Sequence, residues 1–252
     1  MKFVDTHCHL DDERFNEDRE EVLKRIEEKM EFVVNVGFDL PSSKTSVEYS
    51  NTYPFIYSAI GVHPTSISEY NDEVEKELIE LSKNKKVVAI GEIGLDYYWM
   101  EDEKEVQKEG FRKQMRLAEK LNLPVIIHSR NAMADTIEIL NEFPNVRGIV
   151  HCYPGSFESA MNIPSNYYFG IGGVLTFKNS KKTVEFVNKI DISKLVIETD
   201  SPYLTPVPFR GKRNEPIYTE YVVKKIAEIK NIPVEEVLRI TTENAKKIYE
   251  II

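Results

Sequence analysis

The chain has few of the features that indicate a secreted or membrane-embedded protein. Its 252 residues include two cysteines, Cys8 and Cys152, too few for a disulfide framework. No apolar run approaches the roughly 20 residues that a membrane-spanning helix needs. The first residues, MKFVDTHCHL, lack the long apolar stretch and the cleavage site of a signal peptide. These absences predict a reducing, cytoplasmic location and no association with a membrane.

Positive charge is also in short supply. The sequence has 33 Lys and Arg against 42 Asp and Glu, a net charge of −9. Sequence-independent binding along duplex nucleic acid needs a broad surface of Lys and Arg. The negative net charge argues against such a surface. It leaves room for a small phosphate site in a cleft, especially where metal supplies the positive charge. The 41% of hydrophobic residues is enough for a substantial core.

Apolar runs alternate with stretches of helical periodicity along the chain. Eight runs predict strands at residues 2–6, 31–36, 55–60, 86–91, 124–128, 146–151, 167–172 and 194–199. Helices are predicted at 14–29, 72–84, 101–122, 131–142 and 180–189, with further helices in the tail 214–252. Near-continuous apolar strands between helices are typical of a parallel sheet covered on both faces. Eight such strands close a barrel, so we predict an α/β, single-domain TIM (β/α)8 fold over residues 1–252.

Histidine is scarce, and every histidine stands at the end of a predicted strand: His7, His9, His63, His128 and His151. Two carboxylates, Glu92 and Asp200, take equivalent positions after apolar runs. The alternation of side chains along a strand makes His7 and His9 point the same way. Imidazoles and carboxylates gathered from distant strands are typical of a divalent-metal enzyme.

The distribution of these residues also bears on the fold. An open doubly wound sheet is the alternative, and it too places its site beyond the carboxyl ends of its strands. The candidate residues, however, follow six of the eight predicted strands. A closed barrel alone brings all of those ends around one mouth.

Seven motifs resemble, in chain order, those of the TatD family of metal-dependent deoxyribonuclease-like hydrolases in the amidohydrolase superfamily. They are DTHCHL at 5–10, GVHP at 61–64, GEIGLDYY at 91–98, PVIIHSR at 124–130, HCYPG at 151–155, ETDSPYL at 198–204 and RGKRNEP at 210–216. The resemblance implies a TIM barrel with one or two divalent cations at its C-terminal mouth. It also implies hydrolysis of phosphodiester bonds, as a 3′–5′ exonuclease on single-stranded DNA or RNA.

The resemblance further implies a role for each site residue. His7, His9 and Asp200 would hold a first metal together with Glu92. Glu92 would bridge to a second metal, and that metal's other ligands would be His128 and His151. His63 would lie beside the metals and contact the substrate phosphate.

Physical chemistry is consistent with these roles. Two cations can lower the pKa of a shared water and stabilise the attacking and leaving oxygens. Asp200 can orient that water and take its proton as general base, and His63 can donate to a phosphoryl oxygen. Imidazole ligands favour Zn²⁺ or Mn²⁺, whereas Mg²⁺ prefers oxygen. All three metals stay candidates, because members of the family are commonly assayed with Mg²⁺.

Basic and aromatic residues near these motifs predict substrate contacts. Arg210, with its neighbours Lys212 and Arg213, follows the last strand, where barrels often bind phosphate. Arg130 is a further candidate, although an isolated arginine is equally well explained by a solvated ion pair. Four aromatic residues are candidates for stacking on bases or for packing of loops: Tyr97, Tyr98, Trp99 and Tyr153.

The same site chemistry allows a different substrate. Hydrolysis of an amide, a lactone or a phosphotriester is the main alternative, as elsewhere in the superfamily. Those reactions favour an apolar pocket, so the RGKR segment argues for a phosphodiester. A metal-stabilised binding protein without activity is the other alternative. We therefore predict a metal-dependent hydrolase, most simply a nuclease acting on single-stranded nucleic acid or nucleic-acid ends.

Overall fold

The computed structural model describes residues 2–251, and within that range one sheet contains eight strands. They are β1 (Phe3–Cys8), β2 (Met30–Val36), β3 (Ile56–Ile60), β4 (Val87–Asp96), β5 (Val125–Arg130), β6 (Gly148–Val150), β7 (Tyr167–Ile171) and β8 (Leu195–Ile197). Each strand pairs in parallel with the next along the chain. A doubly wound sheet would reverse its strand order part-way. The predicted TIM-barrel fold is therefore confirmed.

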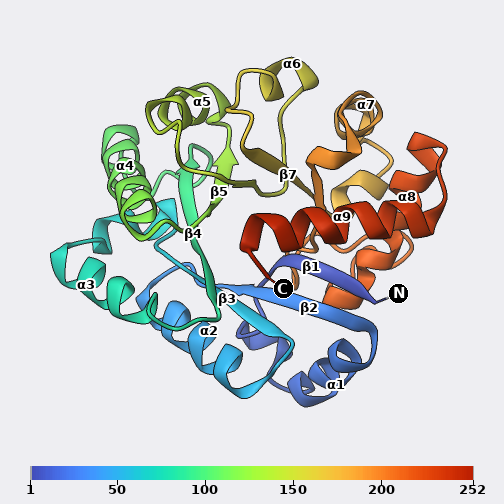
Figure 1. Cartoon of the computed structure of the whole chain (residues 1–252), viewed down its shortest axis with the longest axis horizontal. Helices are drawn as coiled ribbons and strands as arrows, with labels where there is room; N and C mark the ends of the chain where they lie inside the picture. Colours follow the sequence, from blue (N-terminus) through green and yellow to red (C-terminus); the bar gives the residue numbers. More distant parts are fainter. Residues whose placement is uncertain (1, 252) are drawn as a thin grey trace.

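Helices alternate with the strands and surround them (Figure 1). They are α1 (Arg19–Lys29), α2 (Leu40–Thr52), α3 (Asp72–Leu81), α4 (Lys104–Leu121), α5 (Met133–Glu142), α6 (Phe157–Ala160), α7 (Lys181–Lys189), α8 (Thr219–Lys230) and α9 (Val234–Tyr249). Short 3-10 helices are η1 (Glu13–Phe15), η2 (Pro64–Glu69), η3 (Gly173–Thr176), η4 (Ile192–Lys194) and η5 (Pro216–Tyr218). The helices predicted in the tail are present as α8 and α9.

The seam between the first and last strands closes at the carboxyl ends of these strands. Cys8 forms a parallel bridge with Ser201, and the backbone N–H of His9 donates to the Ser201 carbonyl at 2.8 Å. The N–H of Asp200 donates to the His7 carbonyl at 2.9 Å. These bonds hold the segment after β8 against the end of β1, so Asp200 lies beside the two histidines of β1.

One apolar cluster receives side chains from every strand, which places it inside the barrel: Val4, Phe32, Ala59, Val88, Ile126, Ile149, Tyr168 and Val196. Ala245, Ile248 and Tyr249 of α9 join this cluster, and the Tyr249 hydroxyl donates to the Thr6 carbonyl at 3.0 Å. Burial of each large apolar side chain contributes about 1.5–3 kcal/mol. The helix α9 thus covers the end of the barrel at which the strands begin.

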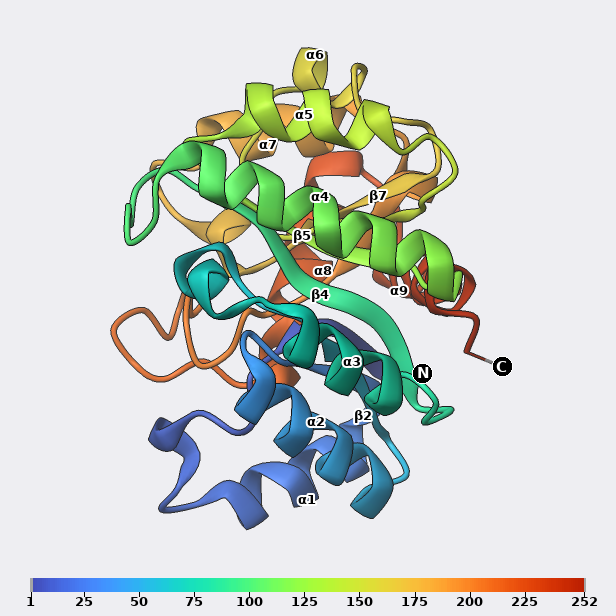
Figure 2. The same ribbon diagram turned by 90° about the vertical axis from the view of Figure 1, so that its left-hand side faces the viewer.

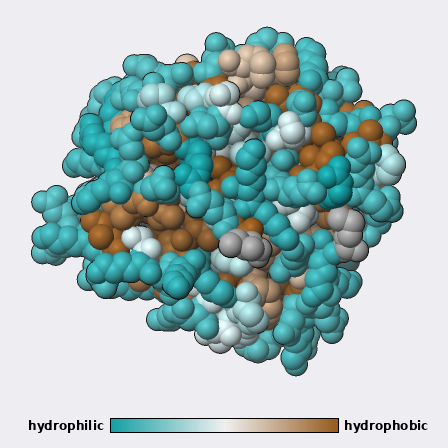
Figure 3. Space-filling view, viewed as in Figure 1, coloured by the Kyte–Doolittle hydropathy of each residue, from teal (hydrophilic) through white to brown (hydrophobic). Residues whose placement is uncertain are grey.

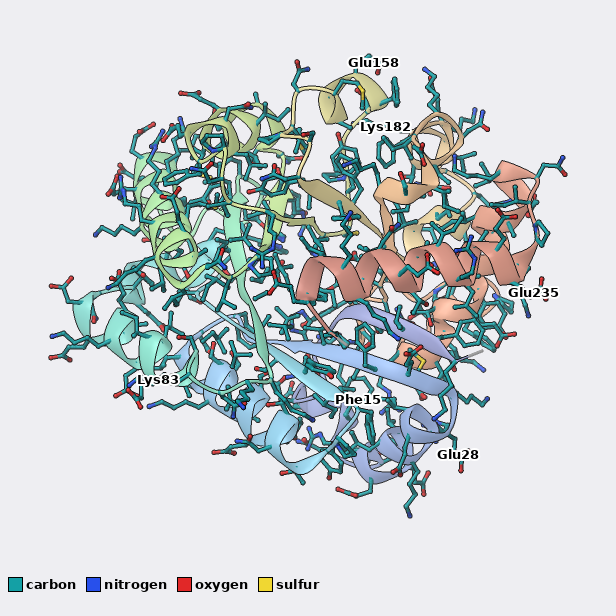
Figure 4. All side chains as sticks on the ribbon, viewed as in Figure 1. Phe15, Glu28, Lys83, Glu158, Lys182 and Glu235 are labelled. Carbon is teal, nitrogen blue, oxygen red and sulfur yellow. The ribbon has the colours of Figure 1, made fainter. Side chains whose placement is uncertain are left out.

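The two ends of the barrel differ, because α9 covers one end and the loops that follow the strands surround the other. Figure 2 shows the termini and α9 on the right-hand side, and the loops that follow the strands on the left-hand side. Figure 3 shows the α9 face as mainly hydrophilic, with apolar side chains visible between α3 and α4. In Figure 4, Glu28, Lys83 and Glu235 point outward, whereas Phe15 lies inside and is fully buried.

No helix within residues 2–251 is long and apolar enough to cross a membrane.

Several elements differ from the sequence-based expectation. The helix α1 begins at Arg19, five residues after its predicted start, and α6 was not predicted. The helix α2 lacks a clear apolar stripe, and small serines fill the face it turns to the barrel: Ser42, Ser43, Ser46 and Ser50 are buried. Ser46 Oγ donates to the Asn35 carbonyl at 2.7 Å. Hydrogen bonding thus replaces the apolar contacts that periodicity detects. The strand β4 also continues to Asp96, five residues beyond its predicted end.

Candidate metal centre

The carboxyl ends of the strands bring the predicted ligands to one place. His7 lies within β1, Glu92 within β4 and His128 within β5, while His9, His63, His151 and Asp200 directly follow strands or lie within three residues of one. All except His7 line a cavity of about 970 Å³ at this end of the barrel. His7 is fully buried beneath it. The structure therefore brings together the six predicted metal ligands and His63.

A first group of donor atoms comes from β1 and from the segment after β8. The Nε2 atoms of His7 and His9 are 3.1 Å apart. Oδ1 of Asp200 lies 3.7 Å and 3.5 Å from these two nitrogens. Two imidazole nitrogens and a carboxylate oxygen that face a common point form a suitable set for a divalent cation.

A second group surrounds the other side of Glu92. Oε1 of Glu92 is 2.9 Å from Nδ1 of His128, 3.3 Å from Nε2 of His151 and 3.8 Å from Nε2 of His63. Its second oxygen, Oε2, lies 3.4 Å from Nε2 of His7. The two oxygens of one carboxylate thus face the two groups separately, which is the geometry that a bridging ligand requires.

Three histidines have one ring nitrogen anchored to the protein. Nδ1 of His9 lies 2.8 Å from the Val36 carbonyl, and Nδ1 of His151 lies 3.2 Å from Oε1 of Glu198. Nε2 of His128 lies 2.9 Å from Oδ2 of Asp96. Burial opposes protonation of these rings, but the neighbouring carboxylates outweigh it and raise the pKa of all three. A cation would therefore displace one proton from each ring, and the acceptor would hold the remaining proton and leave the lone pair of the other nitrogen to the metal. In each ring that other nitrogen faces Glu92 or Asp200, so the donor set fits divalent cations.

The charges of the centre are strongly coupled. Burial opposes ionisation of Glu92, but the neighbouring rings of His151 and His7 outweigh burial and hold the pKa of Glu92 well below its usual value. Burial likewise opposes ionisation of Asp200, and its hydrogen bond with His9 is the main reason that its pKa is lowered instead. Both carboxylates are therefore ionised at neutral pH, as metal ligands must be.

His63 differs from the other histidines in its hydrogen bonds. The backbone N–H of Thr65 donates to its Nδ1 at 3.2 Å, and the Thr65 hydroxyl lies 2.7 Å from the same atom. Burial, reinforced by the nearby ring of His128, lowers the pKa of His63 to about 3. The ring is therefore neutral at pH 7, with its single proton on Nε2. His63 lines the cavity, and its Nε2 lies 3.8 Å from Oε1 of Glu92, in a group with His128 that could itself hold a metal ion. Its contact with a substrate phosphate stays a prediction.

Two buried carboxylates of the site were not predicted from the sequence. Asp96 and Glu198 are 1% and 0% exposed, and each contacts a candidate histidine ligand. Asp96 follows Glu92 by four residues on β4, so the alternation along a strand puts both on one face, and Glu198 precedes Asp200 by two. Gly94, between Glu92 and Asp96, has a φ of 138°, and a Cβ there would lie 2.0 Å from the His128 carbonyl oxygen. Glycine therefore permits the close approach of β4 and β5.

The basic residues that were predicted to contact substrate have different surroundings in the structure. The guanidinium of Arg210 donates to the Thr205 carbonyl at 3.0 Å and lies 3.8 Å above the ring of Phe177, and Arg210 is not among the described residues that line the cavity. Arg213 pairs with Asp18 and Glu215. Arg130, by contrast, lines the cavity. A substrate contact of Arg210 stays a prediction, whereas Arg213 anchors its loop to α1.

The four aromatic residues that were candidates for base stacking also differ in their surroundings. Tyr97 donates to Asp135 at 2.6 Å, and Tyr153 is buried against the ring of Phe169, with a centroid separation of 4.7 Å. These contacts explain both residues as packing residues, and Tyr153 is also among the residues that line the cavity. Tyr98 and Trp99 are instead more than half exposed, and Trp99 lines the cavity.

Comparison with known proteins places the chain in a family. Residues 4–250 match the model of the TatD related DNase family. The chain is 49% identical over 251 residues to the uncharacterized metal-dependent hydrolase YabD of Bacillus subtilis, covering 98% of each. It is 34% identical to the uncharacterized metal-dependent hydrolase YcfH of Escherichia coli K12, covering 100% of this chain and 97% of the relative. The crystal structure of YJJV, a TatD homologue from Escherichia coli K12, superposes with a TM-score of 0.92 at 28% identity over 99% of this chain and 98% of that one. The chain therefore belongs to the TatD family of metal-dependent hydrolases.

Proposed function

We propose that this protein is a metal-dependent phosphodiesterase, a nuclease acting on single-stranded nucleic acid or nucleic-acid ends. The observation that carries the proposal is the position of Glu92, whose two carboxylate oxygens face two separate groups of imidazole nitrogens. Zn²⁺, Mn²⁺ or Mg²⁺ would be held by His7, His9, Asp200 and Glu92 in one group, and by Glu92, His128 and His151 in the other. Residues 1–252 would form one catalytic domain.

The cations would supply positive charge that lowers the pKa of a water and offsets charge on a phosphoryl group. The protein's own groups perform the remaining tasks. Asp200 lies at the cavity, with a lowered pKa that keeps its carboxylate ionised, so it can orient the attacking water and accept its proton. The Nε2–H of neutral His63 can donate to a non-bridging phosphoryl oxygen as negative charge develops there.

Two features support a phosphodiester over an amide or a lactone. The family description names a DNase, and two arginines, Arg14 and Arg130, line the cavity outside the metal-ligand groups. Guanidinium groups suit phosphate because they offer several donors and a permanent charge. Arg14 is paired with Asp12, with Nε 3.4 Å from Oδ1. Arg130 has no carboxylate partner within residues 2–251, so it is the guanidinium of the two that is available to a phosphate.

End-labelled single-stranded DNA and RNA, incubated with the protein and Mg²⁺, Mn²⁺ or Zn²⁺, test the proposal. We expect shortening of the labelled strand by the wild-type protein. Asp200→Asn should lower kcat by about 10²- to 10⁴-fold, the usual contribution of a general base, with an unchanged circular dichroism spectrum. Asp191→Asn, at a surface N-cap, is the matched control and should retain activity. Turnover of cyclic amides or lactones without any cleavage of nucleic acid would overturn the proposal.

A further inference from the structure

An exposed aromatic pair stands at the rim of the cavity, directly after β4. Tyr98 and Trp99 are 54% and 53% exposed, and their rings meet edge to face with centroids 4.9 Å apart. Aromatic side chains of this size bury most of their surface when they serve as packing. Tyr97 and Tyr153 do so in this protein. The exposure of the pair therefore calls for another role.

The backbone that carries the pair is held in place by Asp96, the buried carboxylate that contacts His128. The N–H groups of Tyr98 and Trp99 both donate to Oδ1 of Asp96, at 2.9 Å and 2.8 Å. The other oxygen of the same carboxylate contacts His128. A binding group supported in this way loses little entropy when a ligand arrives. The aromatic pair is thus a preorganised part of the site.

Arg130 completes the cluster. Its guanidinium carbon lies 3.9 Å above the ring of Tyr98 and 5.8 Å from that of Trp99. Within residues 2–251 no carboxylate pairs with it, in contrast to Arg213 and Arg112. Arg130 follows His128 by two residues on β5, so both side chains emerge on one face, roughly 7 Å apart along the strand. That separation suits a neighbouring group of the substrate that reaches the metals.

We propose that Trp99 and Arg130 form a nucleotide subsite, in which the indole stacks on a base next to the scissile bond and the guanidinium binds that nucleotide's phosphate. The proposal rests on the phosphodiesterase function given above. A base offers the flat π surface that an exposed indole accepts, and stacking of this kind tolerates any sequence. Bases in a duplex already stack on each other, so the subsite selects unpaired nucleotides.

The single tryptophan of the chain makes the test specific, because intrinsic indole fluorescence reports on Trp99 alone. The test uses the Asp200→Asn protein, saturated with Mn²⁺ in one series and with Mg²⁺ in another. In each series the protein is titrated with oligothymidylate and, separately, with an abasic oligomer of equal length and charge. We expect saturable quenching by oligothymidylate, with a dissociation constant roughly 5- to 150-fold lower than that of the abasic strand, as expected for one stacked base. Equal fluorescence responses to the two strands would overturn the proposal.

Kinetics separate this proposal from the function on which it rests. Trp99→Ala should raise KM for oligothymidylate by a similar factor and raise KM for the abasic strand far less, because no base stacks there. Trp99→Phe should restore much of the loss. Met100→Ala is the matched control, because Met100 is 48% exposed on the same loop and has no π face. Wild-type protein that cleaves neither strand would refute the nuclease function. Cleavage of both strands with equal KM in wild type and Trp99→Ala would refute the subsite alone.

Discussion

Nε2 of His128 lies 2.9 Å from Oδ2 of Asp96. The opposite nitrogen of the same ring lies 2.9 Å from Oε1 of Glu92. One imidazole is thus held between two carboxylates, of which Glu92 faces the proposed metals and Asp96 faces the exposed loop. Because Asp96 accepts the Nε2–H, Nδ1 keeps its lone pair for a cation. We therefore expect Asp96 to orient His128, the proposed metal ligand, through this hydrogen bond.

Replacement of Asp96 should weaken metal binding. In Asp96→Ala the His128 ring loses the acceptor that fixes its proton, and we expect metal affinity to fall by about 10- to 100-fold, the usual effect of removing such a partner. Asp96→Asn keeps one acceptor oxygen and should lose less. Titration calorimetry with Mn²⁺ or Zn²⁺ measures the effect. Asp102→Ala, on the same loop, is the control. Unchanged affinity in Asp96→Ala would contradict the orienting role.

Replacement of His63 should separate turnover from metal content. Its Nε2 carries a proton, because the Thr65 N–H donates to Nδ1, so His63 is expected to act as a donor and not as a ligand. His63→Ala should lower kcat by about 10²- to 10³-fold, the effect of losing one donor to a developing oxyanion, with metal content unchanged by elemental analysis. His63→Gln retains an N–H donor and should recover part of the activity. Loss of metal from His63→Ala would instead identify a ligand.

Arg213 should matter for stability in a pH-dependent way. It is hydrogen bonded to Asp18 and Glu215, and Arg213→Met should lower the free energy of unfolding by about 1–3 kcal/mol at pH 7, since charged hydrogen bonds are lost.

The Arg213 hydrogen bond holds the pKa of Asp18 below its usual 3.8. A lowered carboxyl pKa stabilises the fold above the unfolded value and ceases to do so as the pH falls through the folded value. The difference between wild type and variant should therefore shrink below about pH 4 in urea unfolding. Arg239→Met removes an exposed pair with Glu243 and should change stability by less than about 1 kcal/mol. A difference that persists at low pH would contradict this role of Asp18.

Much of the fold follows from local patterns. All eight predicted strands are present because their apolar runs are buried on both faces, and α4 follows its predicted periodicity. Prediction failed where burial depends on hydrogen bonds. The serine-rich face of α2 has no apolar period, and β4 continues past Glu92 because Gly94 permits a close approach to β5.

The site was predictable to a similar extent. A single histidine at a strand end is usually a hydrogen-bonded core residue, but all five histidines and two carboxylates at strand ends together indicated a metal centre. The roles of Asp96 and Glu198 were not predicted, because the sequence does not show which side chain a carboxylate near a strand end will contact. The alternation from Glu92 to Asp96 was the available signal.

The sequence by itself determined the residue types and their positions at strand ends, and these indicated a barrel with divalent-metal chemistry. Tertiary structure alone decided which nitrogen of each imidazole ring faces the metal centre. It also decided that Arg213 forms ion pairs whereas Arg130 has no carboxylate partner within residues 2–251. Finally, it left Tyr98 and Trp99 exposed and buried Tyr153. The physical reason is that a proton's position, an ion pair and a ring's exposure depend on partners from distant strands. Local sequence specifies none of those partners, and closure of the barrel brings them together.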